Sequence, residues 1–205
     1  MTVGRNMAGG CADSTRGVFG GGHTGDYSNV IDYITIQSTG NATDFGNLTV
    51  ARKGVGALAD ATRGVFASGN GSGNSFENVM DYITILSTGN ATDFGDLTNT
   101  RKNSAGLASS TRGVFAGGYR PNDGYVNTMD YITIQTTGNA TDFGDLLLAR
   151  RKIGTASNLT RGVWGSGESS SNTNAYEYIT IATTGNCTDF GDGTAVKYGM
   201  AGVSG

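Results

Sequence analysis

The sequence is poor in several residue types, and each shortage argues against a class of protein. Proline occurs once, at Pro121, which excludes collagen and proline-rich linkers. No run of about 18 apolar residues is present, so no membrane-spanning helix is expected. Charged residues make up 15% of the chain and the net charge is −3, so no cluster of basic residues predicts nucleic acid or anionic lipid as a partner.

Signals for secretion and for catalysis are also missing. The N-terminus lacks a basic segment followed by an apolar stretch, so no secretory signal is expected, as in a protein made in the cytoplasm. The single histidine, His23, has no partner at ligand spacing, so the sequence predicts no catalytic residues, no metal site and no cofactor. Cys11 and Cys187 occupy different places in the sequence pattern and are interpreted as small apolar fillers, while a disulfide between them stays open.

Glycine, in contrast, is abundant, with 35 residues in the chain of 205, and it recurs at fixed places. One unit is written four times: Thr-Arg-Gly-Val-Phe, then Asp-Tyr-Ile-Thr-Ile, then Thr-Gly-Asn-Ala-Thr-Asp-Phe-Gly, with small variations. Its period of about 48 residues is typical of a propeller blade or a solenoid unit. The chain divides into units 2–48, 49–97, 98–146 and 147–193, and residues 194–205 begin a fifth unit or supply a ring-closing strand.

Each unit predicts four short strands and essentially no helix. The opening strand, as in residues 53–59, is rich in Gly and Ala and suits close backbone approach at a crowded axis. The second strand is Thr-Arg-Gly-Val-Phe, and the third, as in residues 30–36, alternates and is rich in β-branched and aromatic residues. A Thr-Gly-Asn turn leads to the fourth strand around Asp-Phe-Gly.

The unit resembles the kelch repeat. The residues that carry the resemblance are, in the third unit, the pair Gly117–Gly118, Tyr131, Phe143 with Leu146, and Arg150. The unit departs from the family in having Phe where Trp is usual, a longer gap between Tyr and Phe, and Ser-Gly in two units. The amino-acid sequence of the repeat is similar to that of kelch-like arrays in phage virion proteins, especially those of marine phages. The resemblance implies an all-β fold, a β-propeller of four-stranded antiparallel blades; the alternative is a β-solenoid with two coils per unit.

The two ends of the chain are redundant in this scheme. Residues 2–13 and 194–205 both look like the opening strand of a unit, whereas a closed ring of four blades needs only one. We expect either a longer parent protein or a ring closed between chains, which would make the protein a homo-oligomer. A four-bladed ring closed within one chain stays open as an alternative.

The segments between the second and third strands differ from unit to unit, while the strands are nearly identical. In a propeller these segments emerge on one face, and loops on a rigid scaffold commonly bind partners. Their content of Tyr, Ser, Gly and Asn is typical of adaptable recognition surfaces. The candidate binding residues are His23, Asp26, Tyr27, Phe76, Glu77, Tyr119, Arg120, Asp123, Tyr125, Glu168 and Tyr176.

Two further repeated patterns are interpreted as structural. An acid in the third strand and an arginine in the second are expected to pair between blades, with a polar channel or metal ring as the alternative. The acids are Asp32, Asp81, Asp130 and Glu177, and the arginines are Arg16, Arg63, Arg112 and Arg161. The Asp-rich turns around Asp44, Asp93, Asp142 and Asp189 are predicted to satisfy local backbone groups, and calcium binding there stays open.

These observations favour a non-enzymatic structural or adhesive protein. The resemblance places it in a phage virion, as a tail fibre or decoration component that binds a host glycan or another virion protein. Two alternatives remain: a pure assembly module that closes rings between chains, and a carbohydrate-active enzyme. The enzyme would use the loop acids Asp26, Glu77, Asp123 and Glu168, two of which would have to lie within about 5–10 Å of each other.

Overall fold

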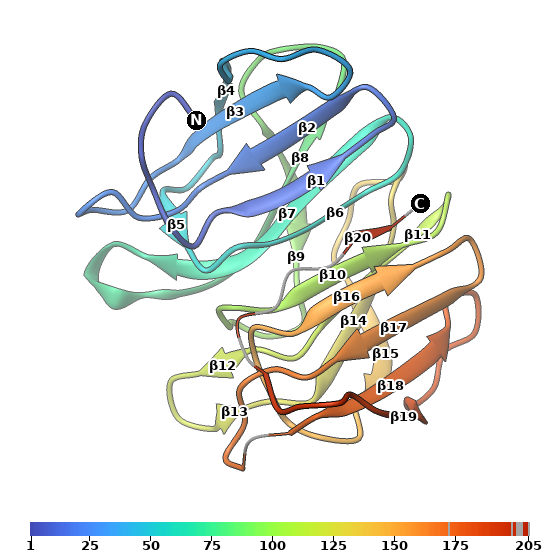
Figure 1. The fold of residues 1–205 in the computed structure, drawn as a ribbon. Helices are drawn as coiled ribbons and strands as arrows, with labels where there is room; N and C mark the ends of the chain where they lie inside the picture. The colour runs from blue at the N-terminus through green and yellow to red at the C-terminus, as the bar shows by residue number, and fades with distance from the viewer. Residues whose placement is uncertain (172, 198, 200–202, 205) are drawn as a thin grey trace.

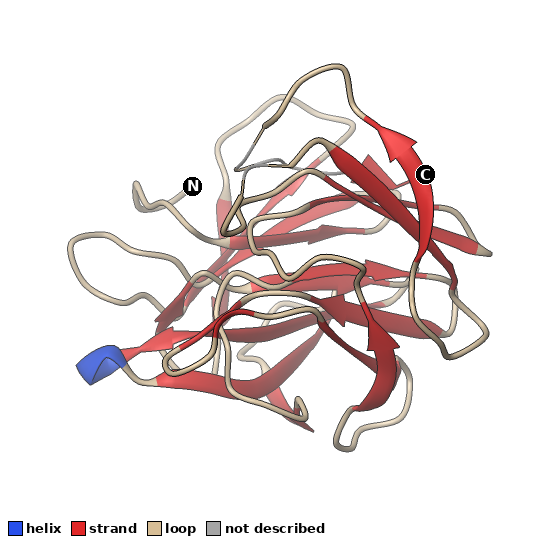
Figure 2. Cartoon of the chain, turned by 90° about the horizontal axis from the view of Figure 1, so that it is seen from below, coloured by secondary structure: helices blue, strands red, loops and turns tan. Residues whose placement is uncertain are grey.

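The computed structural model describes residues 1–205 except 172, 198, 200–202 and 205. The described chain is an all-β protein built from four sheets that follow one another along the sequence and are antiparallel apart from one pair of strands, β16 (Gly154–Ser157) and β20 (Val203–Ser204) (Figure 1). Figure 2 shows one helical turn, η1 (Ser72–Asn74), among the strands, and none of the described segments is an apolar helix long enough to span a membrane. The expectation of an all-β chain with four-stranded units is confirmed.

The four main strands of each sheet are arranged in the order in which they occur in the chain. The first sheet contains β1 (Gly9–Ala12), β2 (Arg16–Gly20), β3 (Val30–Thr35) and β4 (Thr43–Asn47). The second contains β5 (Arg52–Lys53), β6 (Gly56–Ala59), β7 (Arg63–Gly71), β8 (Phe76–Thr84) and β9 (Thr92–Asp96). The third contains β10 (Ala105–Ala108), β11 (Arg112–Ala116), β14 (Thr128–Thr133) and β15 (Thr141–Asp145), with a separate hairpin of β12 (Tyr119–Arg120) and β13 (Gly124–Tyr125). The fourth contains β16 (Gly154–Ser157), β17 (Arg161–Gly165), β18 (Ala175–Thr180), β19 (Thr188–Asp192) and β20 (Val203–Ser204). In addition to the main strand order, β5 and β6 both pair with β7, and β20 lies beside β16.

A β-bulge occurs at the same place in every sheet. In the first sheet Ile31 lies opposite Gly46 and Asp32 lies opposite Asp44, so Phe45 is the extra residue. The glycine beside it has a φ of 144°, a conformation that a residue with a Cβ rarely adopts. The bulge allows Phe45 to be buried against the second sheet. The repeated Phe-Gly pair therefore places an aromatic side chain against the neighbouring sheet.

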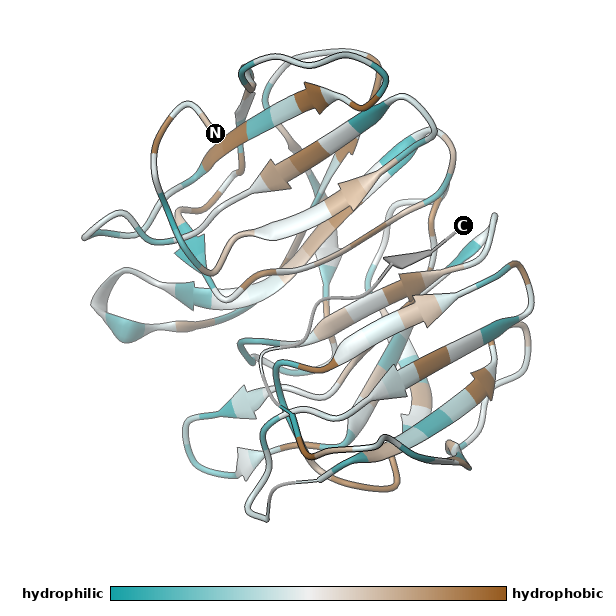
Figure 3. Cartoon of the chain, viewed as in Figure 1, coloured by the Kyte–Doolittle hydropathy of each residue, from teal (hydrophilic) through white to brown (hydrophobic). Residues whose placement is uncertain are grey.

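Successive sheets pack face to face through three apolar clusters. The first and second sheets share Phe45, Leu48 and Ile85, and corresponding residues join the second sheet to the third and the third to the fourth. Figure 3 shows brown hydrophobic residues alternating with paler and teal ones along the strands. Among the described residues no such cluster joins the fourth sheet to the first.

The first strand of each unit lies beside that of the next. An added Cβ on Gly106 of β10 would lie 2.5 Å from the carbonyl oxygen of Ala57 in β6, which explains why glycine is used there. The end of the chain continues this arrangement, because β20 pairs in parallel with β16, with Val203 opposite Ala156. The backbone N–H of Gly167 also donates to the carbonyl of Lys197 (3.1 Å), as Gly118 donates to that of Arg150 (2.8 Å). Lys197 thus fills the place that the opening arginine of a unit fills elsewhere.

The predicted pairing between the second-strand arginines and the third-strand acids is wrong. The acids pair instead with the arginine that opens each unit, and all these side chains are buried. The pairs are Arg5–Asp32 (2.7 Å), Arg52–Asp81 (2.8 Å), Arg101–Asp130 (2.6 Å) and Arg150–Glu177. Strand register explains the error, because Arg16 lies opposite Thr35 in the hairpin, whereas Phe19 lies opposite Asp32.

The second-strand arginines of the first three sheets have a different role, which is to join neighbouring sheets. The guanidinium of Arg16 lies 4.4 Å from the centre of the Tyr33 ring, and its Nη1 donates to the carbonyl of Ile85 in the next sheet (2.9 Å). Tyr33 meets Phe45 edge to face at 5.9 Å. The same stack of Arg, Tyr and Phe recurs in the other three sheets.

Candidate functional site

The unlike segments after the second strand are each anchored at the same point. The first residue of a segment forms a backbone bridge with the residue that follows the opening arginine of a unit. The bridged pairs are Asn6 with His23, Lys53 with Asn70, Lys102 with Tyr119, and Arg151 with Glu168. We call the surface formed by these segments and their bridged partners the loop face.

An aromatic cluster spans the second and third segments of the loop face. Phe76 and Tyr119 have ring centres 6.4 Å apart, and Tyr119 meets Tyr125 edge to face at 5.6 Å. Lys102 lies over the ring of Phe76 (4.7 Å), and Arg151 lies over that of Tyr119 (4.8 Å). These contacts hold the rings in place while leaving them half-buried.

Glu168 connects the third segment to the fourth. Its carboxylate accepts hydrogen bonds from Arg151, from Lys152 (2.9 Å) and from the hydroxyl of Tyr125 (3.0 Å). These bonds lower the pKa of Glu168 to about 2, and the bond from Arg151 has the largest effect. Desolvation alone would raise the pKa. Glu168 is therefore a fixed anion that orients one tyrosine and two cations.

The first segment contributes a smaller cluster. His23 and Tyr27 meet edge to face at 6.2 Å, and the hydroxyl of Tyr27 donates to the amide oxygen of Asn70 (3.2 Å). Lys53 lies 5.0 Å from the centre of the Tyr27 ring. Contacts between neighbouring segments therefore run along the whole loop face.

The remaining predicted residues lie in varied places. Asp26 is exposed and accepts a hydrogen bond from the backbone of Tyr27, while Arg120 and Asp123 form a partly exposed ion pair at 3.0 Å. Several residues expected in loops belong to strands. Phe76 and Glu77 begin β8, Tyr119 and Arg120 form β12, Tyr125 ends β13, and Tyr176 lies in β18.

Tyr176 is the one candidate that the structure places away from the loop face. It lies opposite Gly165 in the hairpin of the fourth sheet, and its ring packs over Gly165 and Gly193. It occupies the position that Ile31, Met80 and Met129 fill in the other sheets. Its placement in a loop is thus corrected: sequence alone could not show where the fourth segment ends and β18 begins.

The acids of the enzyme alternative are engaged separately or solvated. Glu168 binds cations, Asp123 binds Arg120, and Glu77 packs beside Gly71. Among the residues that the structure describes, no hydrogen bond joins two of the four loop acids, and no three His, Cys, Asp or Glu side chains gather as metal ligands. Both cysteines are free thiols, so no Cys11–Cys187 disulfide is present.

The cations of the loop face were missed by the sequence analysis. Lys53, Lys102 and Arg151 come from three different units, at the position after the opening arginine. They are far apart in the sequence, so their gathering on one surface is not visible in the linear chain. The signal that would have found them is the repeat alignment itself, because only the packing of successive units brings equivalent positions together.

Comparisons with known proteins add no assignment to this description: no protein-family model matches the chain, and no curated protein matches it.

Proposed function

We propose that this chain is a non-enzymatic adhesive protein of a phage virion, a tail fibre or decoration component, that binds a host surface glycan through its loop face. The observation that carries this is a contrast between two parts of one repeat. The ion pairs, the Arg-Tyr-Phe stacks and the bulges recur in every sheet, whereas the loop face differs in every unit and presents half-buried Tyr and Phe rings. Rigid aromatic planes with nearby hydroxyl and amide groups suit the apolar faces and hydroxyls of sugar rings.

We also propose that the four sheets are blades of a kelch-like β-propeller. The four main strands of each sheet are ordered from the first to the fourth, the first strands of successive units lie together, and each sheet packs on the next in the same way. These are features of propeller blades, and the kelch-like sequence pattern supports the same architecture.

The binding proposal is tested on a glycan array with the protein and its Tyr119→Ala variant. Tyr119 contacts Phe76 and Tyr125, so removing its ring disrupts the centre of the aromatic cluster. Binding should fall at least tenfold with little change in melting temperature. Leu159→Ser is the matched control, because Leu159 is 72% exposed in a turn where Ser14 and Ser110 stand in other units. Equal binding by Tyr119→Ala and the protein would argue against the loop face.

A second candidate function, assembly between chains, is favoured by the two free sheet faces. Phe190 of the fourth sheet is 54% exposed, whereas the equivalent Phe143 is 2% exposed. Ile36 of the first sheet is 52% exposed, whereas the equivalent Ile85 is fully buried. The fourth sheet thus presents the side that normally covers a following sheet, and the first presents the side that is normally covered.

The three internal interfaces define what a fourth contact would contain. Arg112 Nη1 donates to the carbonyl of Ile181, and Asn186 Oδ1 accepts from the backbone N–H of Asp145 (3.0 Å), with equivalents at the other two interfaces. Between two copies the same bonds would run from Arg161 to Ile36 and from Asp192 to Asn41. Because the two faces differ, we propose a head-to-tail contact between copies of this chain.

The assembly candidate is tested by sedimentation velocity over a concentration series. Burying one Phe contributes about 1.5–3 kcal/mol, so Phe190→Ser should weaken self-association about tenfold or more. Leu86→Gln is the control, since Leu86 is 60% exposed at a position where Gln37 and Gln135 stand in other units. A protein that stays monomeric at every concentration would overturn this candidate and leave the glycan proposal standing.

A further inference from the structure

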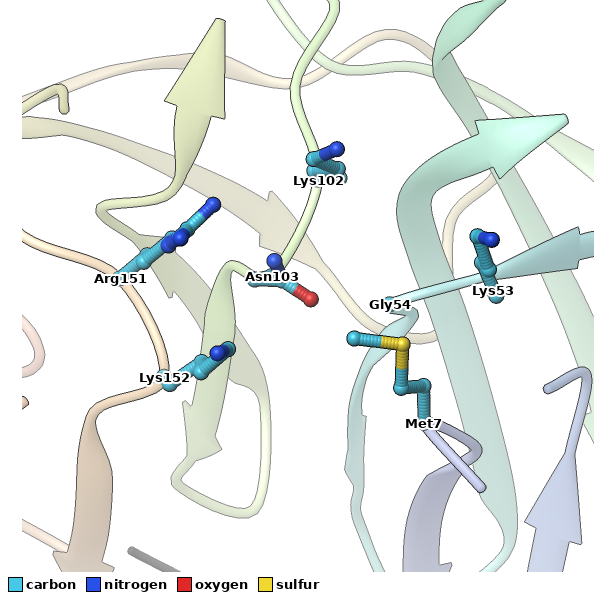
Figure 4. A pocket seen from close by; sticks show the side chains of 7 residues that line it. All are labelled: Met7, Lys53, Gly54, Lys102, Asn103, Arg151 and Lys152. Carbon is cyan, nitrogen blue, oxygen red and sulfur yellow. The ribbon is translucent and has the colours of Figure 1, made fainter. Parts of the chain in front are cut away.

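A small basic pocket opens where the four units meet beside the loop face. It has a volume of about 100 Å³ and is lined by Met7, Lys53, Gly54, Lys102, Asn103, Arg151 and Lys152. The lining comes from all four units and includes the cationic side chains of Lys53, Lys102, Arg151 and Lys152, which Figure 4 labels. We call it the basic pocket.

The pocket is built by the same turn in all four units. Met7, Gly54, Asn103 and Lys152 are equivalent residues, and their φ values of 58°, 69°, 57° and 53° all lie in the left-handed region. Backbone hydrogen bonds link them in series, from the N–H of Gly54 to Met7 (2.9 Å), from Asn103 to Gly54 (2.8 Å) and from Lys152 to Asn103 (3.2 Å). The wall of the pocket is therefore fixed by backbone geometry rather than by mobile side chains.

Positive charge in the basic pocket exceeds the negative charge that faces it. Arg151 and Lys152 share one carboxylate, that of Glu168. Lys53 and Lys102 form no ion pair with a described residue and lie over the uncharged rings of Tyr27 and Phe76. One acid thus serves four cations, in a chain whose net charge is −3.

The repulsion within this cluster is visible at Lys102. Its pKa is lowered first by desolvation and then by the charges of Arg151, Lys53 and Lys152. A bound anion would relieve this repulsion, and a cluster of like charges on a fixed frame gains more from an anion than a single exposed lysine does.

We infer that the basic pocket binds a compact oxyanion, a sulfate or phosphate group carried by an acidic surface glycan. The inference rests on the proposed function, because it names the charge class of the glycan that the loop face takes. The anion would sit among Lys53, Lys102, Arg151 and Lys152, with the amide of Asn103 in the wall as a further donor. Sugar rings attached to it would extend over the neighbouring Phe76 and Tyr119, which already contact Lys102.

Two measurements on the full chain test the inference. The first is titration with inorganic sulfate and, separately, inorganic phosphate, followed by amide NMR. Shifts confined to the turn residues Gly54 and Asn103 and their neighbours are expected, and selective saturation by one anion would identify the preferred group. Absence of saturable shifts with both anions would overturn the inference.

The second measurement compares binding of dextran sulfate and uncharged dextran by the protein, by Lys102→Gln and by Arg161→Gln. Lys102→Gln should weaken dextran sulfate binding at least fivefold. Arg161→Gln removes the same charge from an exposed position at the start of β17, outside the loop face, and should change binding less than twofold. Equal losses in the two variants would mean that charge alone, and not the pocket, attracts the polymer, and would overturn the inference.

Different results would contradict the adhesive function and the anion site. If the glycan array gives only uncharged glycans, and binding survives Lys102→Gln but not Tyr119→Ala, the anion inference is wrong and the adhesive function stands. If no glycan of either kind is bound while sulfate saturates the pocket, the adhesive function is wrong and the anion site remains.

Discussion

At the scale of single residues, the buried arginine that opens each unit has the largest energetic role. Arg101 and Asp130 are both fully buried and 2.6 Å apart, and burial lowers the pKa of Arg101 while the carboxylate opposes that effect. Removing one member of such a pair leaves the other charge buried without a partner. Arg112, in contrast, is partly exposed and donates to the carbonyls of Ile181 and Ala182.

We therefore predict that Arg101→Ala and Arg112→Ala differ in their cost to the free energy of unfolding. Arg101→Ala should lose about 3–5 kcal/mol. Arg112→Ala should lose about 1–2 kcal/mol, because it removes the hydrogen bonds to two carbonyls and a cation–π contact, which water partly replaces. Urea unfolding of the two variants measures both values, and an equal cost would contradict the assigned roles.

Glu168 allows a prediction about pH. Its pKa is about 2 in the folded chain, below the ordinary value of 4.5, so its contribution to stability is fully present above about pH 4.5 and is lost as the pH falls toward 2. Glu168→Gln should lower the melting temperature at pH 7, and the difference from the protein should shrink between about pH 5 and pH 2. A difference that stays constant over this range would show that the ion contacts of Glu168 do not stabilise the fold.

At the scale of elements, the link between sheets is the turn of one unit held against the bulge of the unit before it. The N–H of Gly138 donates to the carbonyl of Phe94 (2.7 Å), and Asn139 Oδ1 accepts from the N–H of Asp96 (3.0 Å). The Thr-Gly-Asn turn was predicted from its residue types, but its partner was not. Asn139 satisfies the backbone of a neighbouring sheet rather than its own turn.

Two equivalent glycines allow the stability cost of disturbing the contact between sheets to be measured apart from the cost of backbone strain. Gly95 and Gly191 both lie in bulges, with φ of 133° and 122°. A Cβ on Gly95 would lie 2.5 Å from the backbone of Gly138, whereas a Cβ on Gly191 would meet nothing within 4 Å. Gly191→Ala should cost about 1–3 kcal/mol through strain. Gly95→Ala should cost about 1–3 kcal/mol more, because it also forces the two sheets apart. Thermal unfolding of both variants measures the difference, and no difference would contradict the packing described.

The same elements show which features of the fold could be predicted from the sequence. The third strand was predicted at residues 30–36 and is found as β3, Val30–Thr35, because alternating β-branched and aromatic residues are a local signal. The bulge at Phe45 and the partner of Asp32 depend on strand register, which no single strand reveals. The cation cluster of the loop face depends on how whole units pack. Prediction from sequence thus weakens as the contact involves more distant segments.

At the scale of the whole molecule, two surfaces compete as the place of function. The loop face varies between units and presents aromatic rings and the cations Lys53 and Lys102, which form no ion pair with the part of the chain that the structure describes; this favours ligand binding. The free faces around Phe190 and Ile36 repeat the chemistry of internal interfaces, which favours assembly. The C-terminal tail, which follows residue 193, bears on the assembly candidate, because its strand β20 lies beside β16 in the position that the first strand of a following unit would take.

This placement predicts that the tail and a second copy compete for the same site. The backbone bond from Gly167 to Lys197 and the pairing of β20 with β16 would both have to break before another copy's β1 could enter. A chain shortened to residues 1–193 should therefore self-associate more tightly than the full chain. Sedimentation velocity on the two chains measures this, and weaker association of the shortened chain would show that the tail supports the contact instead.

The central claim is that ligand binding lies on the loop face and not on the repeated scaffold. The most direct test is hydrogen–deuterium exchange with and without the glycan that binds most tightly on the array. Slower exchange is predicted in residues 23–28, 70–77, 119–125, 151–152 and 168–171, with β19 and the residues around Ile36 on the free faces unchanged. Protection confined to the free faces, with none in the loop segments, would contradict it.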